Sequence, residues 1–209
     1  MNNSLNFLYT KYNNLIWFVV PKVASRSMLQ YFKKQEINFD VERICKLPDD
    51  HGDCFKFAFV RNPWGRIVST YENKIKLQWE NREFAKLPNI KYRIEFYEKF
   101  KNCSFSEFIK WMHTNGTMHD QHTYPQSNLL PFNNLNFLGK YEFLETDFEK
   151  LCKKIKIEFN GLPHENSSNR DYFKPLHTHY TEYYDEETKS IVAEMYSNDI
   201  EYFNYKFGE

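Results

Sequence analysis

The feature that most constrains the fold of this chain is a pattern of strand, loop and helix that occurs twice in its first third. The first copy runs from the apolar stretch 15–20 (LIWFVV) into the polar loop 21–27 (PKVASRS). The second copy runs from 55–60 (FKFAFV) into 61–66 (RNPWGR). Loops at the carboxyl ends of parallel strands that each open a helix are places where α/β proteins bind phosphates. The chain therefore contains two candidate anion sites.

Length and charge limit the class of protein and its partners. The chain has 209 residues, 28 basic and 28 acidic groups and 41% hydrophobic residues, which suits a single globular domain over residues 1–209. Nucleic acids and anionic membranes require a basic face, so the balanced charge argues against both as partners. An anion site in this chain must therefore be local.

The N-terminal segment and the cysteines indicate the compartment. Residues 1–12 are polar and lack the features of a signal peptide, and no apolar run approaches the roughly 18 residues of a membrane span. The four cysteines lie far apart and form no C-x-x-C pair, so the sequence suggests neither a zinc knuckle nor a redox motif. We expect a soluble, cytoplasmic protein with free thiols and no membrane insertion.

Capping signals predict where several helices begin. The first helix is expected to begin near Ser27, with Ser27 as its N-cap. In the second copy Asn62 can cap the helix while Pro63 takes the first helical position. Capping-box spacing predicts two further helix starts, at Ser104 with Glu107 and at Thr146 with Glu149.

The remaining apolar stretches complete the prediction of the fold. Residues 135–138 are expected to form a third strand, and apolar residues at helical spacing over 191–203 predict one terminal helix. The polar segment 116–131 is longer than a simple connection between two elements needs to be, and such long loops often line functional sites. Strands that alternate with helices predict an α/β, P-loop-like three-layer fold, with a central, mostly parallel sheet and helices on both faces.

The first loop can bind an anion without being a standard P-loop. It contains no glycine and places its lysine, Lys22, at the start, which argues against a standard nucleotide triphosphatase. The backbone N–H groups of 23–27, the hydroxyls of Ser25 and Ser27 and the helix dipole can still bind a phosphate while Lys22 reaches a second anionic group. A capped helix with a solvated lysine is the alternative.

The second loop offers an arginine and a serine to a phosphate. Arg61 sits where the strand ends, and Ser69 lies two helical turns beyond Asn62 on the same helix face. The two side chains can bind one phosphate together, with a bidentate contact from the guanidinium. A structural salt bridge is the alternative for an arginine at a strand end.

These two segments carry a resemblance to a known family. Residues 21–27 resemble the 5′-phosphosulfate loop, and residues 59–71 (FVRNPWGRIVSTY) the 3′-phosphate motif, of sulfotransferases that use 3′-phosphoadenylyl sulfate (PAPS). The chain is most similar to the carbohydrate sulfotransferases, including heparan sulfate 2-O-sulfotransferases and bacterial relatives. The similarity continues through 120–126, 137–142 and 199–205.

The resemblance implies the reaction and the roles of several residues. A sulfuryl group passes from PAPS to a hydroxyl acceptor, most often on a carbohydrate, without a metal, and leaves adenosine 3′,5′-bisphosphate. In this mapping Lys22 stabilises the charge that develops on the leaving phosphate, and Arg61 with Ser69 binds the 3′-phosphate. The residues implied at the 5′ end are Lys22, Val23, Ala24, Ser25, Arg26, Ser27 and Met28. Asn166, Ser167 and Arg170 are expected to close over the nucleotide, with a polar surface turn as the alternative.

The acceptor hydroxyl needs a general base, for which histidine is the first choice of residue type. His122, in the long polar loop, is the leading candidate, and His119 lies one turn away if that loop is helical. His51, ten residues before Arg61, is a rival. The pairs His119-x-x-His122 and His177-x-His179 lack a third ligand, so no metal site is expected.

Two other functions remain open from the sequence. A nucleotide kinase or phosphotransferase on a similar core predicts Mg-ATP binding, although the absent glycine-rich loop counts against it. A nucleotide-binding or glycan-binding protein without catalysis predicts affinity but no product. The presence of Lys22, Arg61 and Ser69 together favours an active enzyme.

Overall fold

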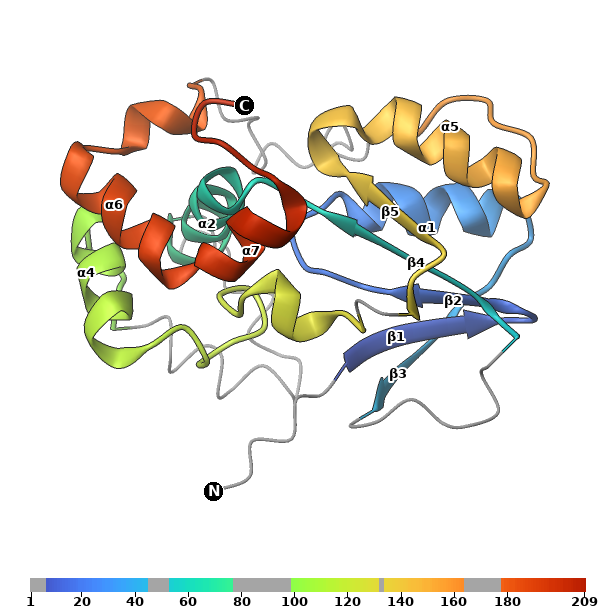
Figure 1. Ribbon diagram of the computed structural model, residues 1–209, viewed down its shortest axis with the longest axis horizontal. Helices are drawn as coiled ribbons and strands as arrows, with labels where there is room; N and C mark the ends of the chain where they lie inside the picture. The colour runs from blue at the N-terminus through green and yellow to red at the C-terminus, as the bar shows by residue number, and fades with distance from the viewer. Residues whose placement is uncertain (1–6, 45–52, 77–98, 132–133, 164–177) are drawn as a thin grey trace. The chain divides into compact units, whose positions relative to one another are not determined.

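A computed structural model describes residues 7–44, 53–76, 99–131, 134–163 and 178–209, whose contacts group into two compact units (Figure 1). The first unit contains the described residues up to Arg61 and those of the segment 126–165, and the second contains those of 62–125 and 166–209. The organisation of the whole chain as one domain stays a prediction. Within the described residues, no helix is long and apolar enough to cross a membrane.

The first unit contains a five-stranded sheet whose central part is parallel. The strands lie in the order β3-β1-β2-β4-β5. Strand β4 pairs in parallel with both β2 and β5. The bounds of these three strands are Leu15–Phe18 for β2, Phe55–Val60 for β4 and Phe137–Lys140 for β5. The predicted α/β class with a parallel core is confirmed, and the third strand begins two residues later than predicted.

Two antiparallel strands extend this sheet and were not predicted. Strand β1 (Phe7–Tyr12) pairs with β2, and β3 (Asp40–Ile44) pairs with β1. The hairpin between β1 and β2 turns at Asn13, whose φ of 49° lies in the left-handed region that asparagine tolerates. The edge strand β3 (DVERI) is polar, and its apolar alternation is too weak to be recognised from the sequence.

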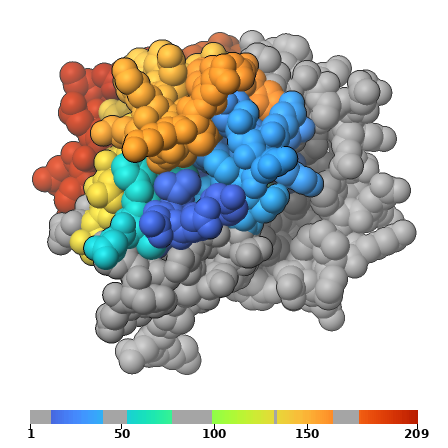
Figure 2. All heavy atoms as spheres, turned by 90° about the vertical axis from the view of Figure 1, so that its right-hand side faces the viewer, coloured from blue at the N-terminus to red at the C-terminus, as the bar shows by residue number. Residues whose placement is uncertain are grey.

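One face of the sheet packs against helices α1 (Ser25–Lys34) and α5 (Leu144–Ile155). Figure 2 shows the two helices side by side. Phe32 of α1 lies with its ring centroid 5.3 Å from that of Phe148 on α5 and 5.9 Å from that of Trp17 on β2. On the opposite face of the same strands Ile16 and Ala58 are fully buried. Both faces of the parallel strands are therefore covered.

The predicted starts of α1 and α5 were wrong. The N-cap of α1 is Ala24, three residues before Ser27, and its backbone is left-handed with a φ of 62°. Helix α5 begins at Leu144, directly after the short 3-10 helix η6 (Tyr141–Phe143), so Thr146 lies inside its first turn. The Thr146 hydroxyl donates to the carbonyl of Phe143 at 3.0 Å and makes no capping box with Glu149.

The second unit contains only helical elements among its described residues. They are α2 (Pro63–Tyr71), the π-helix η2 (Glu72–Lys76), α4 (Phe105–Asn115), the 3-10 helix η8 (Tyr180–Tyr183), α6 (Glu186–Met195) and α7 (Ser197–Phe203). The Asn62 cap of α2 and the capping box of Ser104 with Glu107 on α4 are confirmed. The prediction of a single terminal helix was wrong, because the helix is interrupted at Tyr196, between α6 and α7.

Gly139 provides space for a core aromatic side chain, which gives a first prediction. Gly139 on β5 is the register partner of Phe59 on β4, and a Cβ at this position would lie 2.3 Å from a carbon of the buried Phe59 ring. Gly139→Ala must displace that ring, so we expect a loss of about 1–3 kcal/mol in the free energy of unfolding, measured by urea denaturation. The neighbouring Leu138→Ala is the control, because Leu138 is 38% exposed. An alanine at 139 that costs no more than one at 138 would contradict the packing argument.

Candidate functional site

The carboxyl ends of the three parallel strands bring three segments of the first unit to one edge of the sheet. Because β2, β4 and β5 run in the same direction, the segments that follow them leave from the same edge. These segments are the loop 21–24, Arg61 and the short helix that begins at Tyr141. The two predicted anion loops therefore begin at this edge.

The first loop takes a backbone conformation that normally requires glycine. Lys22 and Ala24 have φ values of 75° and 62°, both in the left-handed region. Non-glycine residues in this region cost free energy and persist where the surrounding structure holds them. The Ser25 hydroxyl donates to the carbonyl of Val20 at 3.1 Å and so ties the start of α1 to the end of the strand segment. The loop is thus a strained turn, of the kind that presents successive N–H groups to an anion.

The start of α1 supplies backbone donors to this edge. As N-cap and first three helical residues, Ala24, Ser25, Arg26 and Ser27 have N–H groups without an intrahelical partner. The N–H of Met28 makes the first helical hydrogen bond, to the carbonyl of Ala24 at 3.2 Å, and its side chain is fully buried. Val23 is also fully buried. The side chains of Val23 and Met28 therefore anchor the loop to the core.

Arg61 lies between the other two segments of this edge. Its Nη1 donates to the carbonyl of Lys22 at 3.2 Å, and its guanidinium carbon lies 4.0 Å from the centre of the Tyr141 ring. Its main-chain N–H donates to Oε1 of Gln126 at 2.9 Å, and its carbonyl accepts from Nε2 of the same side chain at 2.8 Å. The structure therefore joins Arg61 to the first loop through the Lys22 carbonyl.

The remaining residue of the second predicted loop, Ser69, lies on α2 in the second unit and is half-buried. Its joint contact with Arg61 on one phosphate stays a prediction. The side chain of Asn62 accepts from the N–H of Trp64 at 3.1 Å and donates to the carbonyl of Lys206 at 2.8 Å. Asn62 therefore ties the start of α2 to the C-terminal segment of the second unit.

The predicted base His122 is partly buried and forms a pair with the buried Asp120. The Nδ1 atom of His122 hydrogen-bonds with Oδ1 of Asp120, which also accepts from the His122 N–H at 2.9 Å. The side chains are 11% and 4% exposed. A carboxylate that accepts from Nδ1 selects the tautomer in which Nε2 carries the lone pair, which is the arrangement of a histidine held by an acid for proton transfer.

Contacts from α2 and from the junction of α6 and α7 hold the turn that carries this pair. The buried Arg66 on α2 donates to the carbonyls of Tyr124 at 2.8 Å and Gln121 at 3.2 Å. Tyr196, between α6 and α7, donates to the carbonyl of Thr123 at 2.7 Å. Burial raises the pKa of Tyr196, so its phenol stays protonated and remains a donor. Arg66 therefore stabilises the main chain of this turn, and hydrogen bonds to the carbonyls around His122 hold the turn in place.

The other candidate residues are His119, which the structure describes, and four residues that it does not. His119 contacts the carbonyl of Asn115 through Nε2 at 2.9 Å, and its ring lies 4.9 Å from that of Trp111. The segment from His119 to His122 forms turns and not a helix. His51 lies outside the described residues, as do Asn166, Ser167 and Arg170. Within the part of the chain that the structure describes, no three metal-ligating side chains come together.

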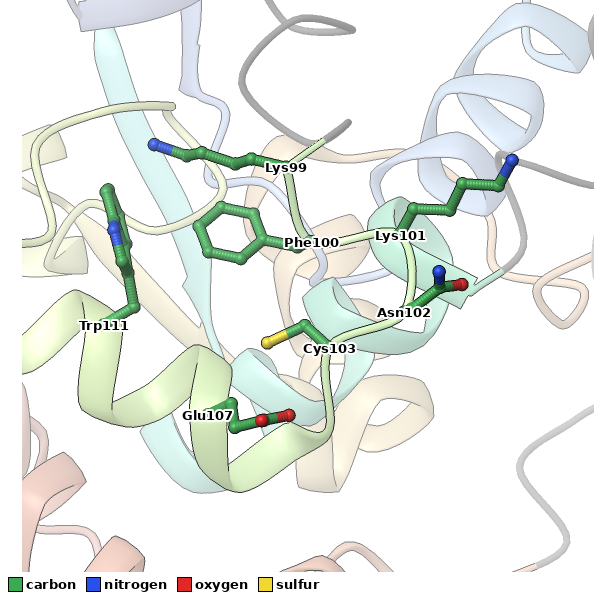
Figure 3. A pocket seen from close by; sticks show the side chains of 7 residues that line it. All are labelled: Lys99, Phe100, Lys101, Asn102, Cys103, Glu107 and Trp111. Carbon is green, nitrogen blue, oxygen red and sulfur yellow. The ribbon is translucent and has the colours of Figure 1, made fainter.

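A pocket of about 590 Å³ lies elsewhere, in the second unit, and contains none of the predicted site residues (Figure 3). Lys99 extends across it so that Nζ lies 3.8 Å from the centre of the Trp111 ring. Desolvation lowers the pKa of Lys99. Glu107, at its rim, accepts hydrogen bonds from the N–H and hydroxyl of Ser104. Lys99 and Glu107 are thus both engaged with neighbouring residues.

Three residues that hold predicted site residues were not singled out from the sequence, although all three lie in segments quoted for the resemblance. Gln126 and Tyr141 hold Arg61, and Asp120 holds His122. Their roles depend on contacts between residues 2 to 80 positions apart. The available signals were Asp120 two residues before a histidine and a polar residue, Gln126, directly after a proline.

Two known proteins and one family model match the sequence of this chain. An uncharacterized protein of Archaeoglobus fulgidus is 34% identical over 111 residues, which cover 52% of this chain and 69% of that protein. Carbohydrate sulfotransferase 14 of Danio rerio is 29% identical over 201 residues, which cover 82% of this chain but only 53% of that relative. No solved structure matches the chain. The model of the sulfotransferase family matches residues 5–206, and the chain therefore belongs to the sulfotransferase family.

Proposed function

We propose that the protein transfers a sulfuryl group from PAPS to a hydroxyl group of a carbohydrate. The observation that carries the proposal is the position of Arg61 against the loop of Lys22, at the edge where the parallel strands end. PAPS carries a phosphosulfate and a separate 3′-phosphate, so its binding calls for two cationic positions at one edge. The match to carbohydrate sulfotransferase 14 supports a carbohydrate as the acceptor.

In this proposal the first loop binds the 5′ end of the donor. The N–H groups at the start of α1 and the helix dipole provide positive potential for the 5′-phosphosulfate. During transfer the acceptor oxygen forms a bond to sulfur while the bond from sulfur to the bridging oxygen breaks. The electron pair of that bond goes to the leaving phosphate, where the ammonium of Lys22 stabilises the charge.

The proton of the acceptor hydroxyl goes to His122. Its Nε2 carries the lone pair because Nδ1 is bound to Asp120. The imidazolium that forms on proton transfer is stabilised by the adjacent carboxylate of Asp120. The chain's own residues thus provide a base and a cation for the leaving group.

Titration calorimetry tests the donor site directly. We expect adenosine 3′,5′-bisphosphate to bind more tightly than AMP or Mg-ATP, because Arg61 contacts the 3′-phosphate. Arg61→Ala removes a charge-assisted contact, so we expect the affinity for the bisphosphate to fall about 10- to 100-fold while that for AMP changes much less.

The control for this experiment is Lys150→Ala, which removes one positive charge from a side chain that is 65% exposed in the same unit. We expect it to leave both affinities unchanged. Tighter binding of Mg-ATP would support a phosphotransferase instead. A wild-type protein that binds the bisphosphate and AMP equally well would contradict the proposed function.

A further inference from the structure

A fully buried glutamine fixes the main chain of Arg61. Gln126 opens the 3-10 helix η4 (Gln126–Leu129) and is 0% exposed. Its amide makes hydrogen bonds of 2.9 Å and 2.8 Å to the N–H and the carbonyl of Arg61. A neighbouring strand would contact a residue in the same two-point manner, but here Arg61 lies beyond the end of β4. Rotation about the backbone of Arg61 would break one of these bonds and leave a buried amide atom unsatisfied, which is costly.

An aromatic ring fixes the other end of the same residue. The guanidinium of Arg61 lies over the ring of Tyr141 at 4.0 Å, and Nη1 is bound to the carbonyl of Lys22. Stacking uses the face of a guanidinium, whereas hydrogen bonds to an anion use the N–H groups at its edge. The ring therefore holds the side chain in a fixed plane without competing for an anion.

These contacts have one consequence for ligand selection. Both ends of Arg61 are held within the first unit by residues of two other segments, 126–129 and 141–143. A bidentate contact from a guanidinium to a phosphate depends on its orientation, and a freely rotating arginine pays an entropy cost when it binds. The orientation of Arg61 is thus set before any ligand arrives.

We propose that Gln126 and Tyr141 are positioning residues that give the site its preference for the 3′-phosphate of the donor. The inference rests on the proposed function, because Arg61 is the residue assigned to that phosphate. Neither residue needs to touch the ligand. Their effect should therefore appear in the ratio of the affinities for adenosine 3′,5′-bisphosphate and AMP, and it should depend on the presence of Arg61.

The first test replaces Tyr141, whose half-buried position makes the fold tolerant of change. We expect Tyr141→Leu to weaken the binding of adenosine 3′,5′-bisphosphate about tenfold in calorimetry, with little change for AMP. Tyr141→Phe keeps the ring and should retain the wild-type ratio. Phe143→Leu is the matched control, because Phe143 belongs to the same short helix and is 61% exposed.

The second test replaces the buried amide and measures coupling. Gln126→Leu keeps the approximate size of the side chain but removes both hydrogen bonds, so we expect the same selective loss for the bisphosphate. If either residue acts through Arg61, its substitution should cause no further loss in an Arg61→Ala background.

The outcomes separate this inference from the proposed function. A wild-type protein without preference for the bisphosphate would overturn both. A wild-type preference that survives in Tyr141→Leu and Gln126→Leu would overturn the positioning role alone. Equal losses for the bisphosphate and AMP would also overturn it, because they would indicate a general structural effect.

Discussion

Replacement of Lys22 by alanine is expected to reduce sulfuryl transfer about 10³-fold, with adenosine 3′,5′-bisphosphate still bound. The reason lies in the proposed role of the ammonium group, which stabilises charge that develops on the leaving phosphate as the bond to sulfur breaks. An interaction that strengthens in the transition state lowers kcat when it is removed. The measurement is the rate of transfer of labelled sulfate from PAPS to a glycan, together with the affinity for the bisphosphate.

The fold should tolerate this change because the contact that orders the loop is made by the main chain of Lys22. Arg61 donates to the Lys22 carbonyl, which alanine retains. The chain also offers a matched control in Lys156, another lysine of the first unit with a left-handed φ, here 60°. Lys156→Ala introduces alanine in the same backbone region, away from the strand ends. Similar rates in the two variants would contradict the role of Lys22.

The parallel core of the fold could be predicted because its strands are short apolar runs bounded by strong helix signals. The predicted strand 55–60 coincides with β4, and Asn62 followed by Pro63 correctly predicted the start of α2. The start of α1 could not be predicted, because Ala24 caps it with a left-handed backbone and no side-chain contact. Nothing in an alanine side chain favours that conformation, which the rest of the structure imposes.

The candidate site likewise contains residues that the local sequence predicts and residues that it does not. The locations of Lys22 and Arg61 after the parallel strands could be predicted, because the local sequence determines where those strands end. Gln126 and Tyr141 act through contacts with Arg61 across 65 and 80 positions of the chain, and no local pattern encodes such contacts. Arg66 shows the reverse case, because an arginine beside a predicted phosphate loop instead donates to the carbonyls of a turn.

Replacement of His122 by asparagine is expected to lower kcat about 10²- to 10⁴-fold, because the acceptor hydroxyl loses its general base. Asparagine retains an N–H that can donate to Asp120, so the turn keeps its internal contact. The carbonyls of the same turn remain bound to Arg66 and Tyr196, neither of which depends on the imidazole. Binding of adenosine 3′,5′-bisphosphate should therefore be unchanged, which separates a loss of the base from a loss of the donor site.

The matched control for this substitution is His113→Asn. His113 lies on α4 in the same unit, with its side chain 42% exposed and paired with Glu194 on α6. A surface histidine of this kind should leave kcat unchanged. A pH profile adds a second readout, since loss of a general base removes the fall in rate at acidic pH. If His122→Asn retains kcat within about tenfold of the wild type, a group other than His122 must take the proton. Asp120→Asn then discriminates further: if His122 is the base, it should lower kcat as well, because a neutral amide no longer stabilises the imidazolium that forms.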